Sequence, residues 1–169
     1  MPRRDPASSE PRVHTMSQYL KDLSFENPHP FLRSSPSTPE PKFDITVGIH
    51  SRKADDGFWM VEFSIRVQAE AEEKTLFLGE LIYAACYQVE NVPEDQIEAV
   101  LHLQCAPLLF PYARQIMDDA VQKGGYPPLH FHVYTQDYES LYKGHLERKR
   151  REAETAAAQQ AAGDAQLKA

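Results

Sequence analysis

The segment at residues 75–89 alternates as a β-strand does, yet both of its faces are apolar. Leu76, Leu78 and Ile82 fall on one face, while Phe77 and Leu81 fall on the other. An antiparallel sheet normally leaves one face to water, so a strand of this kind needs cover on both sides. A chain of 169 residues has few residues left to pack against the second face of this strand, which favours self-association or an apolar partner.

Other segments alternate in the same way and predict three more strands, at residues 19–26, 43–53 and 59–69. In the first of them, Tyr19, Leu23 and Phe25 are expected to share the inner face. Turn-forming residues join the last two strands to each other and to the two-sided strand, at residues 55–57 and 72–74. Three consecutive strands with short turns form an antiparallel meander.

A one-sided helix is predicted within residues 108–129. Pro111 is expected near its start, where a missing N–H costs little, and Gly124 at the C′ position after its end. The apolar residues form two rows at helical spacing: Tyr112, Ile116 and Ala120 in one, and Ala113, Met117 and Val121 in the other. Further helices are expected at residues 91–102, ended by Ala106-Pro107, and at residues 137–146, with Asp137 as N-cap.

The two ends of the chain lack apolar periodicity. Residues 1–15 are rich in Pro, Ser and Arg and are expected to be disordered, so Met16 is a candidate alternative start. From residue 147 the chain is charged and then rich in Ala and Gln; it could stay helical for a few turns, but it has nothing to pack against, and we expect it to fray. The predicted organisation is a disordered extension at 1–16, one domain at 17–146, and a tail at 147–169, with a proline-rich loop at 27–41 inside the domain.

Charge and targeting signals narrow the class of protein. The net charge is −7, which disfavours a nucleic-acid partner and suits a basic protein partner. No run of apolar residues is long enough to span a bilayer, and no secretory signal opens the chain, so a cytoplasmic location is expected. Cys86 and Cys105 are then expected to be reduced thiols, with a disulfide between them as the alternative.

Catalytic motifs are absent from the sequence. No phosphate-binding loop, nucleophile elbow, HExxH or CxxC occurs. His130 and His132 alternate and could supply two metal ligands, but no third ligand stands at motif spacing. Cys105 with His102 is a weak candidate for a nucleophile and its base. We therefore expect a binding protein with no metal, no cofactor and no enzymatic activity.

Three segments together resemble the SecB protein-export chaperone family. They are LLFPYAR followed by a short helix and GGYPPL, YLKDLSFENP at residues 19–28, and FLGEL at residues 77–81. The resemblance implies an α+β fold, in which an antiparallel four-stranded sheet carries helices on one face. It also implies a homotetramer, a dimer of dimers with helices between two eight-stranded sheets. The implied function is that of a cytoplasmic holdase, which keeps precursor proteins unfolded and delivers them to the ATPase motor SecA.

The resemblance also implies roles for particular residues. Those matching the motor-binding positions are Asp22, Glu26, Leu78 and Glu80. Those matching the oligomer interface are Gly79, Leu81 and Tyr83. The expected client-binding residues are Phe43, Ile45, Leu141, Tyr142 and Leu146.

Three other functions stay open at the level of sequence. A related chaperone could serve other cytoplasmic clients, and a protein of this composition could bind small apolar ligands. An enzyme would have to use His130, His132 or Cys105.

Overall fold

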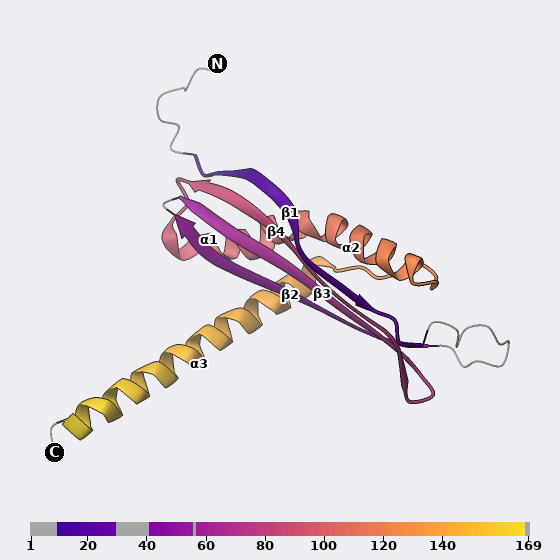
Figure 1. The fold of residues 1–169 in the computed structure, drawn as a ribbon. Helices are drawn as coiled ribbons and strands as arrows, with labels where there is room; N and C mark the ends of the chain where they lie inside the picture. The colour runs from indigo at the N-terminus through magenta and orange to yellow at the C-terminus, as the bar shows by residue number, and fades with distance from the viewer. Residues whose placement is uncertain (1–9, 30–40, 56, 168–169) are drawn as a thin grey trace. The chain divides into compact units, whose positions relative to one another are not determined.

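The computed structural model describes residues 10–29, 41–55 and 57–167, with side chains to residue 160. Its elements follow one another along the chain as β1 (Arg12–Glu26), β2 (Lys42–Asp55), β3 (Phe58–Ala71), β4 (Lys74–Glu90), α1 (Glu94–Val100), the π-helical segment η2 (Leu101–Cys105), α2 (Ala106–Lys123) and α3 (Thr135–Leu167) (Figure 1). They form two compact units, Met1–His132 and Val133–Ala169. The division precedes α3, whereas the sequence suggested a tail from residue 147.

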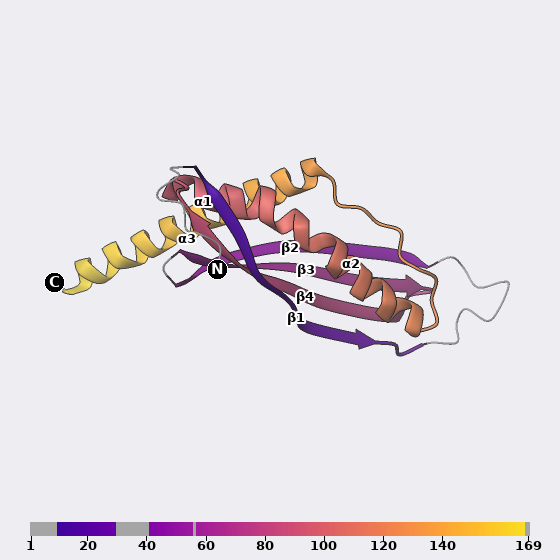
Figure 2. The same cartoon turned by 90° about the horizontal axis from the view of Figure 1, so that it is seen from above.

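The four strands form one antiparallel sheet in the order β1-β4-β3-β2. β2, β3 and β4 make the predicted meander, and β1 lies beside β4, which gives the strand order of a Greek key. The turn between β3 and β4 has positive φ at Glu72 (50°) and Glu73 (60°), and the β2–β3 turn has Gly57 at 73°. The predicted α+β fold with helices on one face of the sheet is confirmed, as Figure 2 shows for α2.

The core lies between α2 and the face of the sheet that it covers, which we call the inner face. Strand β3 gives this face Val61, Phe63, Ile65 and Val67, all at most 1% exposed. From α2 it receives the row Ala113, Met117 and Val121, each 0% exposed. The second predicted row of α2 does not share this cover, since Tyr112 is 51% exposed and Ile116 is half-buried.

The helical run from Glu94 to Lys123 is continuous, so the predicted break at Ala106-Pro107 is wrong. The wide turns of η2 carry the chain from α1 into α2, and Pro107 falls at the first positions of α2, where its missing N–H is tolerated. Pro111 lies inside α2 and not near its start. The helix therefore begins earlier than its apolar spacing suggested.

The two glycines after α2 serve different purposes. Gly124 is the C-cap with a helical φ of −72°, and Gly125 has the left-handed φ of 87°, so the C′ position was predicted one residue early. A Cβ on Gly124 would come within 2.6 Å of the Phe25 ring. Gly124 thus permits close packing of α2 on β1, and Gly125 permits the turn.

Strand β1 is longer and less regular than predicted. It begins at Arg12, which pairs with Glu90, so residues 12–15 are part of a strand and the prediction of disorder there is wrong. The register shifts between Thr15 and Ser17 and again between Leu20 and Asp22. Each shift changes which residues face inward. The rest of the predicted extension, residues 1–9, lies outside the described residues, as do residues 30–40 of the predicted loop.

Helix α3 extends to Leu167, beyond the predicted end at residue 146, and so includes most of the segment predicted as a tail, where fraying stays a prediction. Its later part consists largely of Ala, Glu, Gln and Arg, which have high helix propensity. At its start, Asp137 Oδ2 accepts a hydrogen bond of 2.7 Å from the Tyr134 N–H. Asp137 thus lies in the first turn of α3 and is not its N-cap.

Candidate functional site

The face of the sheet opposite α2, which we call the outer face, brings together the four predicted motor-binding residues. Antiparallel partners point to the same face, and the register pairs Glu26 with Leu78 and Ser24 with Glu80. Asp22 pairs with Ile82 on the same face. Asp22, Glu26, Leu78 and Glu80 therefore form one patch across β1 and β4, with carboxylates around an apolar side chain. We call these four residues the acidic patch.

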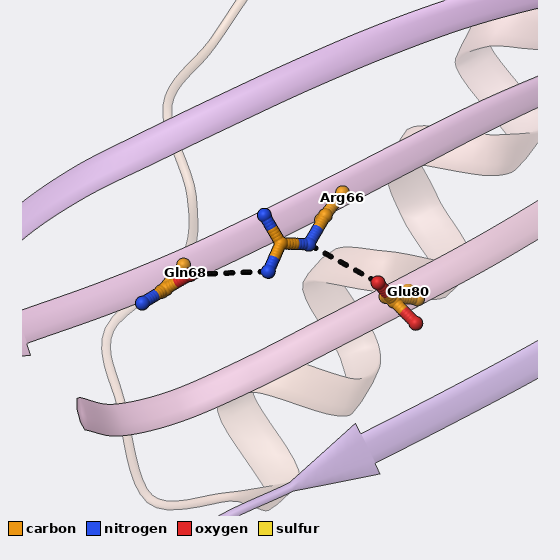
Figure 3. A network of polar contacts seen from close by, with 3 residues as sticks. All are labelled: Arg66, Gln68 and Glu80. Atoms are coloured by element: carbon orange, nitrogen blue, oxygen red, sulfur yellow. Dashed lines mark hydrogen bonds and ion pairs between the residues drawn. The ribbon is translucent and has the colours of Figure 1, made fainter.

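Glu80 has a basic neighbour that sequence reasoning did not single out. Arg66 of β3 is its register partner, and Arg66 Nε lies 3.1 Å from Glu80 Oε1. Arg66 Nη2 also donates to Gln68 Oε1 at 3.2 Å, and Gln68 Nε2 donates to Glu70 Oε1 at 2.5 Å. Figure 3 shows the Arg66 guanidinium between Gln68 and Glu80, on the side of the sheet away from α2. The only sequence signal was strand parity, which puts these β3 residues on the outer face.

A second ion pair crosses the sheet next to the acidic patch. Lys21 is the extra residue at the second register shift of β1, and its Nζ lies 2.7 Å from Glu62 Oε1 on β3. To reach Glu62 it passes over β4 where Ala84 pairs with both Tyr19 and Glu62. Ala84 is 0% exposed although it lies on the outer face. A small residue at this position leaves room for the lysine stem.

The shift at Lys21 also corrects the prediction for Tyr19. Tyr19 pairs with Ala84 on the outer face, whereas Leu23 and Phe25 pair with Leu81 and Gly79 on the inner face. The three residues do not share one face, because an added residue between them inverts the alternation. Tyr19 is 43% exposed and borders the acidic patch.

The predicted interface residues lie on the inner face, beneath α2. Leu81 is 1% exposed and Gly79 is buried, so neither offers surface to another chain. Tyr83 is half-buried and its ring stacks on Tyr112 of α2, with centroids 5.9 Å apart. Of the three, Tyr83 alone reaches toward the exposed row of α2. An interface at these positions stays a prediction.

The predicted client-binding residues of β2 lie where the inner face is least covered. Helix α2 packs against β4 and β3, and Phe43 of β2 remains 45% exposed with Ile45 half-buried beside it. Phe43 joins an aromatic cluster through Phe77, at 6.2 Å between ring centroids. Phe77 in turn contacts Phe25 at 5.3 Å and Tyr126 at 4.6 Å. The cluster gives Phe43 a fixed apolar support.

The remaining predicted client-binding residues belong to the second unit. On α3, Leu141 and Tyr142 are half-buried and Leu146 is 41% exposed. They follow one another at helical spacing with Tyr138. Their role stays a prediction.

The candidate enzyme residues Cys105 and His102 are both buried. Cys105 is 2% exposed, and burial raises the pKa of its thiol from 9.0 to about 11, which keeps it protonated near neutral pH. His102 is fully buried, with Nε2 3.1 Å from Ser51 Oγ. In the described part of the chain, His130 and His132 belong to no group of three or more potential metal ligands. Within the same part, none of the helices combines the length and apolarity needed to cross a membrane.

Comparison with known proteins agrees with this arrangement. A family model described as preprotein translocase subunit SecB matches residues 6–149. The protein-export protein SecB of Hyphomonas neptunium is 38% identical over 150 residues, which cover 87% of this chain and 86% of that protein. The protein of the same name from Orientia tsutsugamushi (strain Boryong) is 40% identical over 124 residues, covering 73% and 78% of the two chains.

A solved structure shares the fold. It is a SecB-like chaperone of Mycobacterium tuberculosis in complex with a ChAD peptide from the HigA1 antitoxin, with a TM-score of 0.59 and 14% identity, covering 73% of this chain and 91% of that one. Members of the matched family are chaperones and not enzymes. The match over most of the chain, together with the Greek-key sheet and its helical cover, shows that this chain belongs to the SecB family of protein-export chaperones.

Proposed function

We propose that this protein is a cytoplasmic holdase that keeps precursor proteins unfolded and passes them to a SecA-type motor. Family membership supports a chaperone role in protein export. The observation that supports the holdase is Phe43, a large aromatic side chain that is 45% exposed on the inner face. An unfolded chain offers the apolar side chains that would cover it, and a folded chain does not.

The aromatic cluster explains why such a surface would accept many clients. Burial of apolar area is non-directional, so Phe43 and Ile45 do not require a defined client sequence. Covering one large apolar side chain contributes roughly 1.5–3 kcal/mol, so several weak contacts add to useful affinity. The solved mycobacterial relative holds a peptide on the same fold. We include Leu141, Tyr142 and Leu146 of α3 as further client-binding residues.

The acidic patch is the proposed docking site of the motor. Asp22, Glu26 and Glu80 carry negative charge on the face opposite the client-binding residues of β2, so a motor and a client would not compete for one surface. Carboxylates attract and orient a basic partner segment. Leu78 lies among them and offers an apolar contact, which suits a segment that alternates basic and apolar residues.

Assembly as a dimer of dimers would use the exposed row of α2. Leu108 is 54% exposed and Tyr112 is 51% exposed, and Ile116 continues the row. A helix with an uncovered apolar row on its far side favours association through that row.

The test is refolding of a slow-folding precursor, followed by fluorescence in the absence of nucleotide. A protein that binds the unfolded state slows the appearance of native precursor by mass action. We expect a delay when the chaperone is added before refolding starts, and no effect when it is added to native precursor. A requirement for nucleotide, or equal binding to the native precursor, would contradict the holdase.

Two variants test whether the delay in refolding depends on the exposed Phe43 side chain. Phe43→Glu should shorten the delay because a charge cannot enter an apolar contact without losing its water. Met16→Glu is the matched control, since Met16 is 53% exposed on β1, at the other edge of the sheet. A SecB-like chaperone for other cytoplasmic clients would show the same delay but would not bind a SecA-type motor, which separates the two functions.

A further inference from the structure

Arg66 stands directly beside Glu80, as its partner in the β3–β4 register. Its guanidinium holds the Glu80 carboxylate at 3.1 Å and the Gln68 amide oxygen at 3.2 Å (Figure 3). We propose that Arg66 masks Glu80 and thereby sets the affinity of the acidic patch for a basic segment of a SecA-type motor. This inference rests on the motor docking proposed above.

A basic partner can readily break the ion pair between Arg66 and Glu80, because both side chains are well exposed. Arg66 is 47% and Glu80 51% exposed at the side chain, and water screens an ion pair of this kind, so it contributes little to stability. A basic group of the partner can therefore replace Arg66 at Glu80. The patch then presents three carboxylates to the partner.

The displaced guanidinium keeps a partner within its own strand. Gln68 Oε1 already accepts a hydrogen bond from Arg66 Nη2, and Gln68 is itself held by Glu70. Gln68 and Glu70 lie two and four residues beyond Arg66 on the same strand face, on the side of β4 opposite β1. Arg66 can remain on β3 while Glu80 turns toward the docked segment.

The charge of Arg66 also opposes a cationic partner before contact. Like charges repel over about one Debye length, roughly 8 Å at physiological ionic strength. Across β4, Arg66 is in register with Ser24 of β1, about two strand spacings or roughly 10 Å away. Asp22 and Glu26 lie farther off on either side of Ser24, so the repulsion from Arg66 acts mainly on a cation that approaches Glu80. A partner must therefore engage several members of the acidic patch to bind well, and one with a single basic group gains little.

The experiment measures the affinity of a SecA-type motor for the full-length wild type, Arg66→Gln, Glu80→Gln and the double variant. At about 0.1 M salt we expect Arg66→Gln to bind about two- to fivefold more tightly, the range that an exposed ion pair spans. The gain should vanish near 1 M salt, where the Debye length is about 3 Å. It should also be smaller in the Glu80→Gln background, because Arg66 acts through Glu80.

Two variants control for structural effects. Arg66→Lys keeps the charge and should bind as the wild type does. Arg52→Gln removes the same charge from the outer face of β2, two strands from Glu80, and should give a smaller gain. Unchanged melting temperatures would show that the fold is intact.

The outcomes separate the inference from the proposed function. If the wild type does not bind the motor, the proposed docking site is wrong, and the proposed effect of Arg66 on it is wrong as well. If the wild type binds and Glu80→Gln weakens binding, but Arg66→Gln binds equally or more weakly, only the mask is wrong. A gain fully retained in the double variant would likewise overturn it.

Discussion

Gly79 lies beneath Met117, and a Cβ placed on this glycine would come within 2.8 Å of the Met117 sulfur. The same Cβ would lie 3.4 Å from Phe25 Cδ2. Helix α2 therefore packs closely on β4 at this glycine, and β1, β4 and α2 meet at this point.

Gly79→Val should destabilise the fold by about 1–3 kcal/mol, the usual cost of overpacking a filled core. Gly79→Ala is the milder control and should cost less, because the flexible Met117 side chain can move aside. Urea unfolding of both variants measures the difference. A Gly79→Val protein as stable as the wild type would show that α2 does not lie so close to β4.

Tyr112→Glu should weaken association of the chain and leave each subunit folded. Tyr112 is 51% exposed, so the introduced carboxylate stays hydrated in the isolated subunit. It would lose its hydration only when a second chain covers it. Light scattering at micromolar concentration gives the mass. An unchanged mass for Tyr112→Glu, or a wild type that is already monomeric, would contradict the proposed interface.

Leu81→Asp is the contrasting variant. Leu81 is 1% exposed within one chain. The free energy of unfolding of the variant should therefore fall by at least roughly 1.5–3 kcal/mol, the contribution of a buried leucine. The variant should unfold before any effect on association is seen. Circular dichroism would detect this loss. A folded but monomeric Leu81→Asp would instead place Leu81 in the interface itself.

Asp22→Lys should reduce the affinity for a SecA-type motor by roughly tenfold, because the reversed charge repels a basic segment. Binding of unfolded clients should be nearly unchanged, since Asp22 lies on the outer face and Phe43 on the inner. Titration of the variant with each partner gives both affinities. Loss of both activities would indicate damage to the fold, and unchanged motor binding would remove Asp22 from the site.

The Cys105 thiol should make stability fall at alkaline pH. Burial raises its pKa from 9.0 to about 11, so between these values the unfolded chain releases a proton that the native chain retains. The stability contributed by the buried thiol is complete below pH 9 and is lost as pH rises toward 11. Burial also raises the pKa of Tyr87, from 10.0, so the slope between pH 9 and 10 is the cleaner measure.

Denaturant unfolding across that interval, with Cys105→Ala as reference, tests this expectation: the variant should show a shallower slope. A thiol reagent gives a second readout, because half-buried Cys86 should react first and Cys105 only after unfolding. Equal reaction of the two thiols in the native protein would contradict the burial of Cys105.

Much of the fold was predictable because its signals are local. Alternation gave β2, β3, β4 and the turns between them, and helical spacing gave the buried row of α2. The acidic patch was also predictable, since Leu78 and Glu80 share strand parity and no register shift separates Asp22 from Glu26. The roles assigned to these residues came from family resemblance and not from spacing.

The errors arose where one residue changes the periodicity. The extra residue at Lys21 moves Tyr19 to the outer face, and no local preference of Lys marks it as a bulge. Strand parity alone puts Arg66 on the outer face but cannot put it beside Glu80, because the pairing of two strands depends on the turn between them. The register shift next to that turn, where Leu76 of β4 is the extra residue opposite Ala69 and Glu70, is not marked in the alternation.

The π-helical segment η2 adds one residue to an otherwise α-helical run. The Ala106 N–H bonds to the Leu101 carbonyl five residues back, whereas an α-helix bonds four residues back. A π turn therefore holds about one residue more than an α turn, and the helix on either side keeps its phase. Deleting exposed Leu103 should convert η2 to an α-helical turn and leave Ala113 and Met117 against the sheet. A deletion between Ala113 and Met117 would instead turn every later side chain by about 100° around the axis. In η2 the chain can change length without exchanging the hidden side of α2 for the side left to other chains.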